Sequence, residues 1–298
     1  MKRKPEKKVN LARALSAAVQ AATSVGLLMR RQLGSPKRAF AVTQHDIKLE
    51  LDVRCQKMIE RRLHSAFPDV GSLGEEGVAG DSNAEYRWVV DPIDGTVNFA
   101  YGIPHACVSI ALQSRAQAQP ERIAPTLRGL SVTAERRRRP KLGIPSATYP
   151  DGYQTLVGVI YDPFCDELWT ATVGQSARLN GKVIHVSLRR RLKEAIVSIG
   201  LSKSREHLEA TLPLLNKLAR RVRKIRIMGA GALDLAYVAT GRFDAYIERC
   251  IRLWDIAAGG LILECAGGEV WREPIAGEYA YRMVASNRLL RRQLAGFD

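Results

Sequence analysis

The sequence predicts an α/β or layered α+β fold, because β-prone runs alternate with segments of helical periodicity along the chain. Two observations support this prediction. Apolar residues recur at helical spacing in several stretches, and compact β-prone runs lie between them. With 298 residues and no internal repeat, the chain suits one domain of two packed halves, about 1–187 and about 188–298.

The first half is expected to contain two amphipathic helices followed by three strands. Gly34-Ser35-Pro36 ends the first helix, and Pro68 follows the second. The last two strands should pair as neighbours. The segment between them, 114–154, has scattered Pro and Gly and no periodicity, which predicts a surface insertion. The expected ranges are 11–33 and 48–67 for the helices, and 87–90, 108–112 and 155–161 for the strands.

The second half is expected to alternate strands and helices. A hairpin over 171–186, whose turn is marked by Asn180-Gly181, is expected just before it. The acid Asp255 at the start of the last helix agrees with the preference of helix N-termini for negative charge. The expected ranges are 208–221, 231–240 and 255–266 for the helices, and 224–228 and 243–247 for the strands.

The composition predicts a soluble protein of a reducing compartment. Apolar residues make up 46% of the chain, and no apolar run approaches the ~20 residues that span a bilayer. The segment after the basic residues 1–8 lacks the continuous apolar core of an export signal. The five cysteines are odd in number and widely spaced, which suits reduced thiols better than disulfides or zinc. We therefore expect a cytoplasmic protein that makes no contact with a membrane.

Two segments carry most of the net charge of +16. Residues 1–40 contribute +9 and residues 114–154 contribute +5, which leaves +2 for the rest of the chain. Basic runs are usually solvated surface, and a dedicated anion- or RNA-binding role is the alternative.

The densest chemical signal is the turn Asp91-Pro92-Ile93-Asp94-Gly95-Thr96. Its two carboxylates follow a β-prone run, and ligands gather at strand ends in open sheets. Magnesium prefers oxygen ligands, so the two acids and the carbonyl of Ile93 fit a pair of ions. The amides of Gly95 and Thr96 would then receive phosphate oxygens. The alternative is a turn without chemistry, since Asp, Pro and Gly are common in turns.

Two further acidic sites favour the chemical interpretation. Gly74-Glu75-Glu76-Gly77 places paired carboxylates in a glycine-flanked loop, and Asp255 begins the otherwise apolar segment 256–263. Alone, Asp255 would be interpreted as a helix N-cap. Together with the turn, these acids fit a metal cluster.

With these motifs in order, the sequence resembles the inositol monophosphatase family of lithium-sensitive, magnesium-dependent phosphatases. The resemblance covers nearly the whole chain except the first few residues and the 114–154 insertion. It implies a layered α-β-α-β-α sandwich of the sugar-phosphatase type, and a homodimer. The motifs that carry it are Gly74-Glu75-Glu76 and residues 91–99, 174–181, 239–246 and 254–259.

The resemblance also implies the site residues and two or three Mg²⁺ ions. Glu75 and Thr96 would orient the attacking water, and paired ions would stabilise the attacking and leaving oxygens. The implied metal ligands are Glu75, Asp91, Asp94 and Asp255 and the carbonyl of Ile93.

A supporting acid is implied at Asp52, where the family has a carboxylate behind the threonine. The chain departs from the family at two nearby positions, with Leu51 in place of a Thr and Ala41 in place of a frequent Lys. These departures affect the third, weaker metal position.

On the substrate side, Glu248 corresponds to the family's acid that binds substrate hydroxyls, and Gly229-Ala230-Gly231 to its wall of small residues. A buried acid that accepts two hydroxyls selects polyols. Two alternatives are that Glu248 merely pairs with Arg249 or Arg252, and that the glycines merely form a turn. The other implied substrate contacts are Asp94, Gly95, Thr96 and Asp255.

We therefore predict an enzyme, a phosphoric monoester hydrolase that acts on a small polyol or sugar phosphate. Val97-Asn98-Phe99 favours inositol monophosphate, because it is close to the corresponding residues of inositol phosphatases. A fructose-1,6-bisphosphatase-type activity is an alternative if Arg242, Arg249 and Arg252 bind a second phosphate. Another is a non-enzymatic RNA or transcription accessory role, although the basic segments lack aromatic residues for base stacking.

Overall fold

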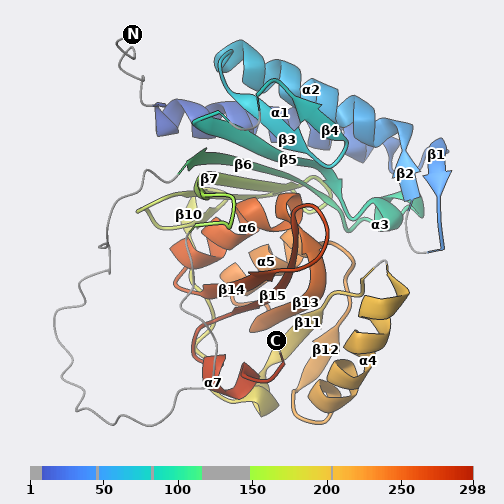
Figure 1. Cartoon of the computed structure of the whole chain (residues 1–298), viewed down its shortest axis with the longest axis vertical. Helices are drawn as coiled ribbons and strands as arrows, with labels where there is room; N and C mark the ends of the chain where they lie inside the picture. Colours follow the sequence, from blue (N-terminus) through green and yellow to red (C-terminus); the bar gives the residue numbers. More distant parts are fainter. Residues whose placement is uncertain (1–8, 45–46, 82–83, 116–147, 203, 298) are drawn as a thin grey trace.

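The computed structural model describes residues 9–44, 47–81, 84–115, 148–202 and 204–297. Helices and sheets alternate in layers (Figure 1). The helices are α1 (Leu11–Gln32), α2 (Glu50–Ala66), α3 (Thr96–Ala100), α4 (Arg205–Ala219), α5 (Gly231–Ala239), α6 (Leu253–Cys265) and α7 (Arg291–Leu294). The strands are β1 (Ala39–Val42), β2 (Ile47–Leu49), β3 (Gly71–Gly74), β4 (Gly77–Ala79), β5 (Tyr86–Asp94), β6 (Cys107–Arg115), β7 (Tyr153–Asp162), β8 (Glu167–Thr172), β9 (Arg178–Leu179), β10 (Lys182–Val183), β11 (Ile196–Ile199), β12 (Lys224–Arg226), β13 (Ala245–Arg252), β14 (Glu269–Pro274) and β15 (Ala280–Ser286).

The larger sheet has eight strands in the order β10-β9-β8-β7-β6-β5-β3-β4. Neighbouring strands are antiparallel, except for the parallel pair β3 and β5. β6 and β7 lie side by side with Val108 opposite Tyr161, which confirms that these two runs are neighbours. β1 and β2 form a separate two-stranded sheet.

Two helices, α1 and α2, cover the outer face of this sheet. α1 turns small side chains such as Ala14, Ala18 and Ala22 toward the sheet, which allows the helix to pack closely. The sheet meets them with the fully buried side chains of Trp88 and Val159. The apolar periodicity seen in the sequence is therefore the buried side of both helices.

α1 bears on the prediction that no apolar run approaches the length that spans a bilayer. By length and hydropathy it would pass as a membrane span, the one helix in the described residues that does so. In the structure its buried residues belong to the core beneath it, which it shares with α2, β6 and β7.

A second helical layer, α5 and α6, lies between the two main sheets (Figure 1). α6 is buried along almost its whole length after the first turn, as expected for a helix that is apolar on every side. Its approach to β7 depends on Gly158, where a Cβ atom would lie 2.7 Å from the carbonyl oxygen of Ala258. This contact sets the distance between α6 and the larger sheet.

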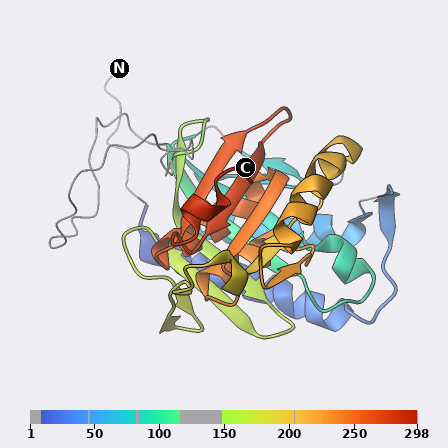
Figure 2. The same cartoon turned by 90° about the horizontal axis from the view of Figure 1, so that it is seen from below.

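The smaller sheet has five strands in the order β12-β11-β13-β15-β14. β11, β12 and β13 are parallel, and β15 is antiparallel to both of its neighbours. α4 and α7 cover its outer face through a cluster that includes Leu214, Leu218 and Phe297. Figure 2 shows α4 lying along this sheet. The five layers confirm the predicted α-β-α-β-α sandwich.

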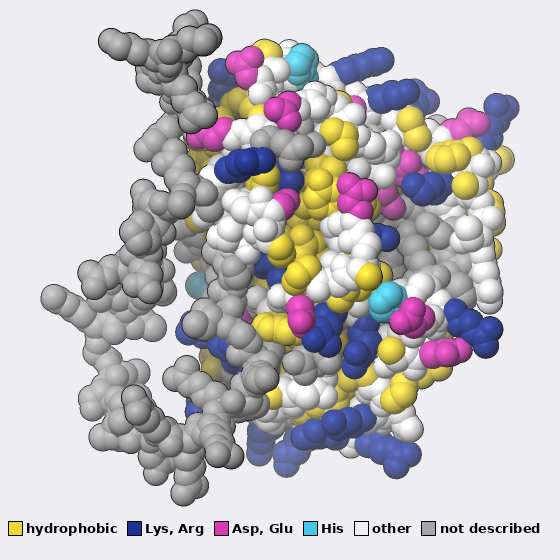
Figure 3. Space-filling view, in the orientation of Figure 1, with side chains coloured by type: hydrophobic (Ala, Val, Ile, Leu, Met, Phe, Trp, Pro, Cys, Tyr) yellow, Lys and Arg dark blue, Asp and Glu magenta, His cyan; other side chains and the backbone are white. Residues whose placement is uncertain are grey.

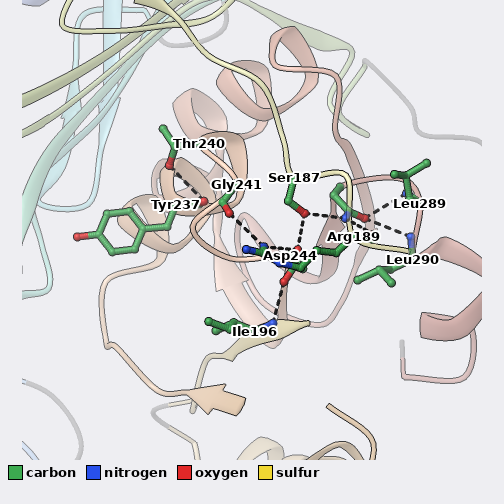
Figure 4. A network of polar contacts seen from close by, with 10 residues as sticks. Ser187, Arg189, Ile196, Tyr237, Thr240, Gly241, Asp244, Leu289 and Leu290 are labelled. Atoms are coloured by element: carbon green, nitrogen blue, oxygen red, sulfur yellow. Dashed lines mark hydrogen bonds and ion pairs between the residues drawn. The ribbon is translucent and has the colours of Figure 1, made fainter. Parts of the chain in front are cut away.

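A buried aspartate, Asp244, ties the chain segment between the two sheets to the start of β13 (Figure 4). Its carboxylate accepts hydrogen bonds from the Ser187 hydroxyl, from Arg189 Nη1 at 2.9 Å and from the Ile196 amide at 2.8 Å. Asn287, which follows β15, donates to the Ser187 hydroxyl and to the Arg189 carbonyl. This network holds the ends of β11, β13 and β15 together.

Several element boundaries differ from the predictions. The expected insertion 114–154 is shorter, because β6 continues to Arg115 and β7 begins at Tyr153, opposite it. The Asn180-Gly181 turn is confirmed, but it joins two strands of only two residues each. β1 to β4, β11, β14 and β15 were not predicted. The basic segments 1–8 and 116–147, with Arg136–Arg139, lie outside the described residues.

Candidate functional site

The predicted Asp-Pro-Ile-Asp turn is the last part of β5, which bulges as it ends. Asp91 lies opposite Ser109 and Asp94 opposite Cys107, so the register shifts between the two acids. Pro92 fits this bulge because it has no amide hydrogen to give to the ladder. The Ile93 amide donates to Asp91 Oδ1 at 3.0 Å, which fixes the orientation of that carboxylate.

The residue after the bulge is Gly95, which adopts a left-handed conformation with φ of 89°. A Cβ atom there would lie 2.9 Å from the His105 carbonyl oxygen, so both the conformation and the space require glycine. α3 starts at the next residue, Thr96, whose hydroxyl donates to the Ile93 carbonyl at 2.9 Å. The turn therefore brings Thr96 next to the carbonyl that was predicted to be a ligand.

The start of α5 anchors the second acid, Asp94. Its Oδ1 accepts from the Gly231 amide at 3.2 Å and its Oδ2 from the Ala232 amide at 2.8 Å. The Cys107 thiol lies 3.6 Å from Oδ2 and donates to it. Free amides at a helix N-terminus favour a negative charge. Asp94 thus joins the large sheet to the middle helical layer.

Asp255 supplies a third carboxylate from the first turn of α6. Its Oδ2 accepts from the Arg252 amide at 3.0 Å, as an acid at this helical position commonly does. One oxygen from each of Asp91, Asp94 and Asp255 lies within 4.8 Å of the others. Acids that are about 160 residues apart in the sequence therefore meet at one point, as predicted.

Glu75 lines the same cleft as these three acids. The predicted loop around it is the tight turn between β3 and β4, and its amide donates to the Val90 carbonyl at 3.2 Å. The neighbouring Glu76 instead forms an ion pair with Lys48, whose Nζ lies 3.7 Å from Glu76 Oε2. Of this acidic pair, only Glu75 faces the cluster.

Burial and like charge raise the pKa values of two acids in this cluster. The pKa of Asp91 lies well above its usual value because of burial, and then because of the charges of Glu75, Asp94 and Asp255. Burial also raises the pKa of Asp94, to about 6, although the Ala232 amide opposes the shift. A divalent cation would neutralise this repulsion, and carboxylate oxygens are the ligands that Mg²⁺ prefers. The cluster therefore fits the predicted metal.

Asp52 lies behind this cluster, in the first turn of α2, and is 3% exposed. Its Oδ2 accepts from the Leu49 amide at 2.8 Å, and its buried Oδ1 has no hydrogen-bond partner. Burial raises its pKa to about 7. The predicted support of Thr96 by Asp52 is not seen, because the Thr96 hydroxyl donates to Ile93 instead.

The cluster lines a cleft of about 760 Å³. The same lining includes Glu248 and the Gly229-Ala230-Gly231 segment, whose Gly231 amide donates to Asp94, so the structure brings the predicted metal and substrate residues together. The Tyr246 hydroxyl donates to Glu248 Oε2 and fixes the position of this carboxylate. Polar groups thus surround a space that suits a small molecule.

The three arginines considered for a second phosphate lie in different places. Arg252 lines the cleft, whereas Arg249 lines a separate pocket beside His207. Arg242 is held by both carboxylate oxygens of Glu167. A second phosphate in the cleft would therefore meet one of these arginines rather than three.

Comparison with known proteins identifies the family to which the chain belongs. The sequence model described as the inositol monophosphatase family matches residues 10–136 and 150–290. The chain belongs to the inositol monophosphatase family.

Similar relatives and solved structures cover almost the whole chain. The "Nus factor SuhB" of Xylella fastidiosa is 35% identical over 260 residues, which are 86% of this chain and 81% of that protein. "Inositol monophosphatase 1" of Solanum lycopersicum is 33% identical and covers 92% of this chain and 90% of its own. The crystal structure of the extragenic suppressor protein suhB from Bartonella henselae has a TM-score of 0.77 at 31% identity, covering 95% and 97% of the two chains.

In this member of the inositol monophosphatase family, the cleft contains polar residues that sequence reasoning missed. Asp234, in α5, is 1% exposed and lines the cleft, and its Oδ1 has no hydrogen-bond partner. Burial raises its pKa well above the usual value, and a hydrogen bond with Ser198 opposes the shift. An acid within the apolar run Ala232 to Ala236 was the available signal, as it was for Asp255. Ser202, which follows β11, also lines the cleft but gave no such signal.

Proposed function

We propose that this protein is a magnesium-dependent phosphatase that hydrolyses a small polyol or sugar phosphate monoester, with inositol monophosphate as the first candidate substrate. The observation that carries this proposal is the meeting of Asp91, Asp94 and Asp255 within 4.8 Å at the end of β5. Membership of the inositol monophosphatase family supports it.

The ligands of two or three Mg²⁺ ions would be Glu75, Asp91, Asp94 and Asp255, with the Ile93 carbonyl. Bound magnesium lowers the pKa of water and neutralises charge on the phosphate. Glu75 would accept a hydrogen bond from the attacking water. Because the Thr96 hydroxyl donates to Ile93, its oxygen lone pairs remain to accept a second bond from that water. The Gly95 and Thr96 amides would bind phosphate oxygens.

The part of the cleft lining that contains Glu248 and residues 229–231 would bind the alcohol part of the substrate. Glu248, held by the Tyr246 hydroxyl, would accept hydrogen bonds from two sugar or polyol hydroxyls. The small side chains of Gly229, Ala230 and Gly231 leave room for a ring against the wall. A bisphosphate substrate is less well supported, because Arg242 is engaged by Glu167 and Arg249 lines a separate pocket.

The test of the reaction is the substitution Asp94→Asn, which keeps the shape of the side chain and removes its charge. We expect magnesium-dependent phosphate release to be abolished while the variant stays folded, as circular dichroism would check, although one amide at the start of α5 loses its acceptor. Asp69→Asn, which changes an exposed acid between α2 and β3 that does not line the cleft, is the control and should stay active. Full activity of Asp94→Asn would refute the assignment.

The substrate is tested by a phosphate-release screen with magnesium. Inositol 1-phosphate, fructose 1,6-bisphosphate, an adenosine bisphosphate and histidinol phosphate would be compared at equal concentration. We expect selective turnover of inositol 1-phosphate. Faster turnover of the fructose bisphosphate would identify that compound as the substrate instead.

The proposal includes lithium inhibition of this turnover, a homodimer measurable by light scattering, and a cytoplasmic location.

A second candidate function is an accessory role in transcription, because two relatives at 35% and 32% identity carry the name "Nus factor SuhB". The basic segments 1–40 and 114–154 would contact RNA through its phosphates. Such binding weakens steeply with salt. A salt titration of RNA binding with and without residues 116–147, a deletion that leaves the paired residues of β6 and β7 in place, tests this role, and equal binding by both chains would count against it.

A further inference from the structure

Basic side chains gather at one end of the five-stranded sheet, in three segments that the sequence analysis did not single out. They precede β11, lead into β12 and follow β15, and all but Arg291 are exposed. Figure 3 shows Lys and Arg side chains along the lower end of the molecule, where α4, α7 and the C-terminus lie in Figure 1. We call this surface the basic edge. Its residues are Arg189, Arg190, Arg191, Lys193, Arg220, Arg221, Arg223, Lys224, Arg288, Arg291 and Arg292.

Hydrogen bonds join the three segments into one surface. The Arg223 amide donates to the Ala195 carbonyl at 2.9 Å, which connects the second segment to the first. Gln293 Nε2 donates to the Arg190 carbonyl at 2.6 Å, and Gln293 Oε1 accepts from the Leu192 amide, which connects the third. Segments that are about 100 residues apart are therefore adjacent.

Few acids balance this charge. Ion pairs connect Arg189 to Asp244, Arg191 to Glu194 and Arg291 to Glu269. The other eight basic residues form no ion pair with an acid in the described part of the chain.

The composition of the basic edge suits phosphate groups. Nine of its eleven residues are arginine, whose planar guanidinium binds phosphate with two hydrogen bonds. No aromatic ring is available for base stacking within these segments, and the nearby Phe297 is buried under Lys217 and Arg221. Such a surface neutralises a backbone without reading bases.

We propose that the basic edge binds the phosphate backbone of nucleic acid without sequence specificity. This site is separate from the cleft and does not depend on the proposed phosphatase function. The parallel strands β11, β12 and β13 begin at the basic edge. The cleft-lining residues Gly200 and Gly229 lie beyond the other ends of β11 and β12, and Glu248 of β13 lies beside Gly200. A nucleic acid held there would leave the cleft open.

An anionic membrane is the competing partner for a basic surface. Attachment to a membrane surface typically uses an amphipathic helix whose apolar face enters the lipid. Here the apolar side of α4 is buried on the sheet, and α7 has only four residues. The geometry therefore favours a nucleic acid.

The experiment compares two variants of the full-length protein that each lose four positive charges. The basic-edge variant carries Arg190→Gln, Lys193→Gln, Arg223→Gln and Arg292→Gln. The control variant carries Arg54→Gln, Lys57→Gln, Arg61→Gln and Arg62→Gln, which are exposed positions of α2 in the outermost layer on the other side of the molecule. Both keep the segments 1–40 and 114–154. Binding of a fluorescent 20-base-pair RNA duplex is measured by anisotropy over a range of salt concentrations.

We expect the basic-edge variant to bind the duplex at least about tenfold more weakly. The slope of log K against the logarithm of the salt concentration should become less steep by about three. The control should stay within about twofold of the wild type. Thermal unfolding checks that both variants are folded. Equal weakening of the two variants, no binding by the wild type, or binding only to phosphatidylserine vesicles would each overturn the proposal.

Discussion

At the scale of single residues, Asp234 is the most informative addition to the cleft. Burial raises its pKa well above the usual value, and its buried Oδ1, which has no hydrogen-bond partner, is placed to meet a substrate hydroxyl in the cleft. If the proposed function holds, Asp234→Leu should raise KM for a polyol phosphate roughly tenfold or more, because a hydroxyl loses its partner. Asp234→Asn keeps a donor and an acceptor, so its KM should stay near that of the wild type.

The control for this prediction is a phosphate ester without hydroxyls, such as phenyl phosphate. Its KM should be the same for the wild type and both Asp234 variants, because it has no group for Asp234 to bind. Equal increases in KM for both esters would indicate a structural role instead. If the wild type hydrolysed neither ester, the phosphatase function itself would be contradicted.

A second buried acid, Asp52, predicts a dependence of stability on pH. Its pKa is about 7 in the folded chain against an ordinary value of 3.8. The protonated form of Asp52 contributes fully to the free energy of unfolding below the ordinary pKa of 3.8. This contribution is lost as the pH rises through the folded-state pKa of about 7. Asp52→Asn removes this loss, so its advantage in the free energy of unfolding should grow between pH 4 and 7, to at most about 4 kcal/mol.

Urea denaturation of the metal-free protein at several pH values measures this advantage. Asp69→Asn provides the comparison, since it replaces an exposed acid and should follow the wild type across the range. A constant difference between Asp52→Asn and the wild type at all pH values would show that Asp52 does not titrate in this way.

The sequence predicted the residues that lie beside glycine, proline or strand ends. Asp91 and Asp94 stand in a turn whose geometry Pro92 and Gly95 dictate, so their spacing singled them out as candidate ligands, and Glu75 and Asp255 favoured a metal site over a plain turn. Asp234 has no such neighbour, and its approach to the cleft depends on how α5 packs between two sheets. Local sequence carries no direct record of that packing.

At the scale of elements, the Asp244 network fixes how β11, β13 and β15 begin and end. Asp244→Asn replaces one acceptor oxygen with an NH₂ group that faces donors from Ser187, Arg189 or Ile196. We expect a loss of about 2–4 kcal/mol in the free energy of unfolding, as for other disrupted buried networks. Chemical denaturation measures this loss.

An exposed ion pair offers the contrast. Arg205 and Glu209 lie at successive turns of α4 with side chains 90% and 62% exposed. Arg205→Gln should therefore change the stability by less than about 0.5 kcal/mol. A similar loss for the Arg205 and Asp244 variants would mean that the buried network contributes no more than a surface contact.

Long periodic helices and β-branched runs were predictable, and short strands were not. α1 and α2 follow the expected ranges within a few residues, since each has an apolar side that repeats over several turns. β3 and β11 have four residues each, which is too short to show an alternating pattern. Their pairing with β5 and β13 defines them, and that pairing is not local.

At the scale of the whole molecule, the metal ligands come from separate layers. Asp91 and Asp94 belong to the larger sheet, whereas Asp255 belongs to the helical layer behind it. A cation held by all three would bind the folded state alone. Magnesium at 100 times its dissociation constant should therefore raise the free energy of unfolding by about 2.7 kcal/mol.

Thermal unfolding with EDTA and with increasing magnesium measures this effect. Asp255→Asn should remove most of the increase, while Asp69→Asn should retain it. An equal increase in both variants would place the stabilising ion elsewhere.

The two sheets use residues 71–183 and 196–286, and we propose that they are the two halves of one domain.

The cleft and the basic edge lie at opposite ends of the parallel strands β11 and β12. A polyanion bound along the basic edge would hold the protein by that end alone. Molecules gathered on such a polymer would share one orientation, with every cleft opening toward bulk solution and its diffusing solutes.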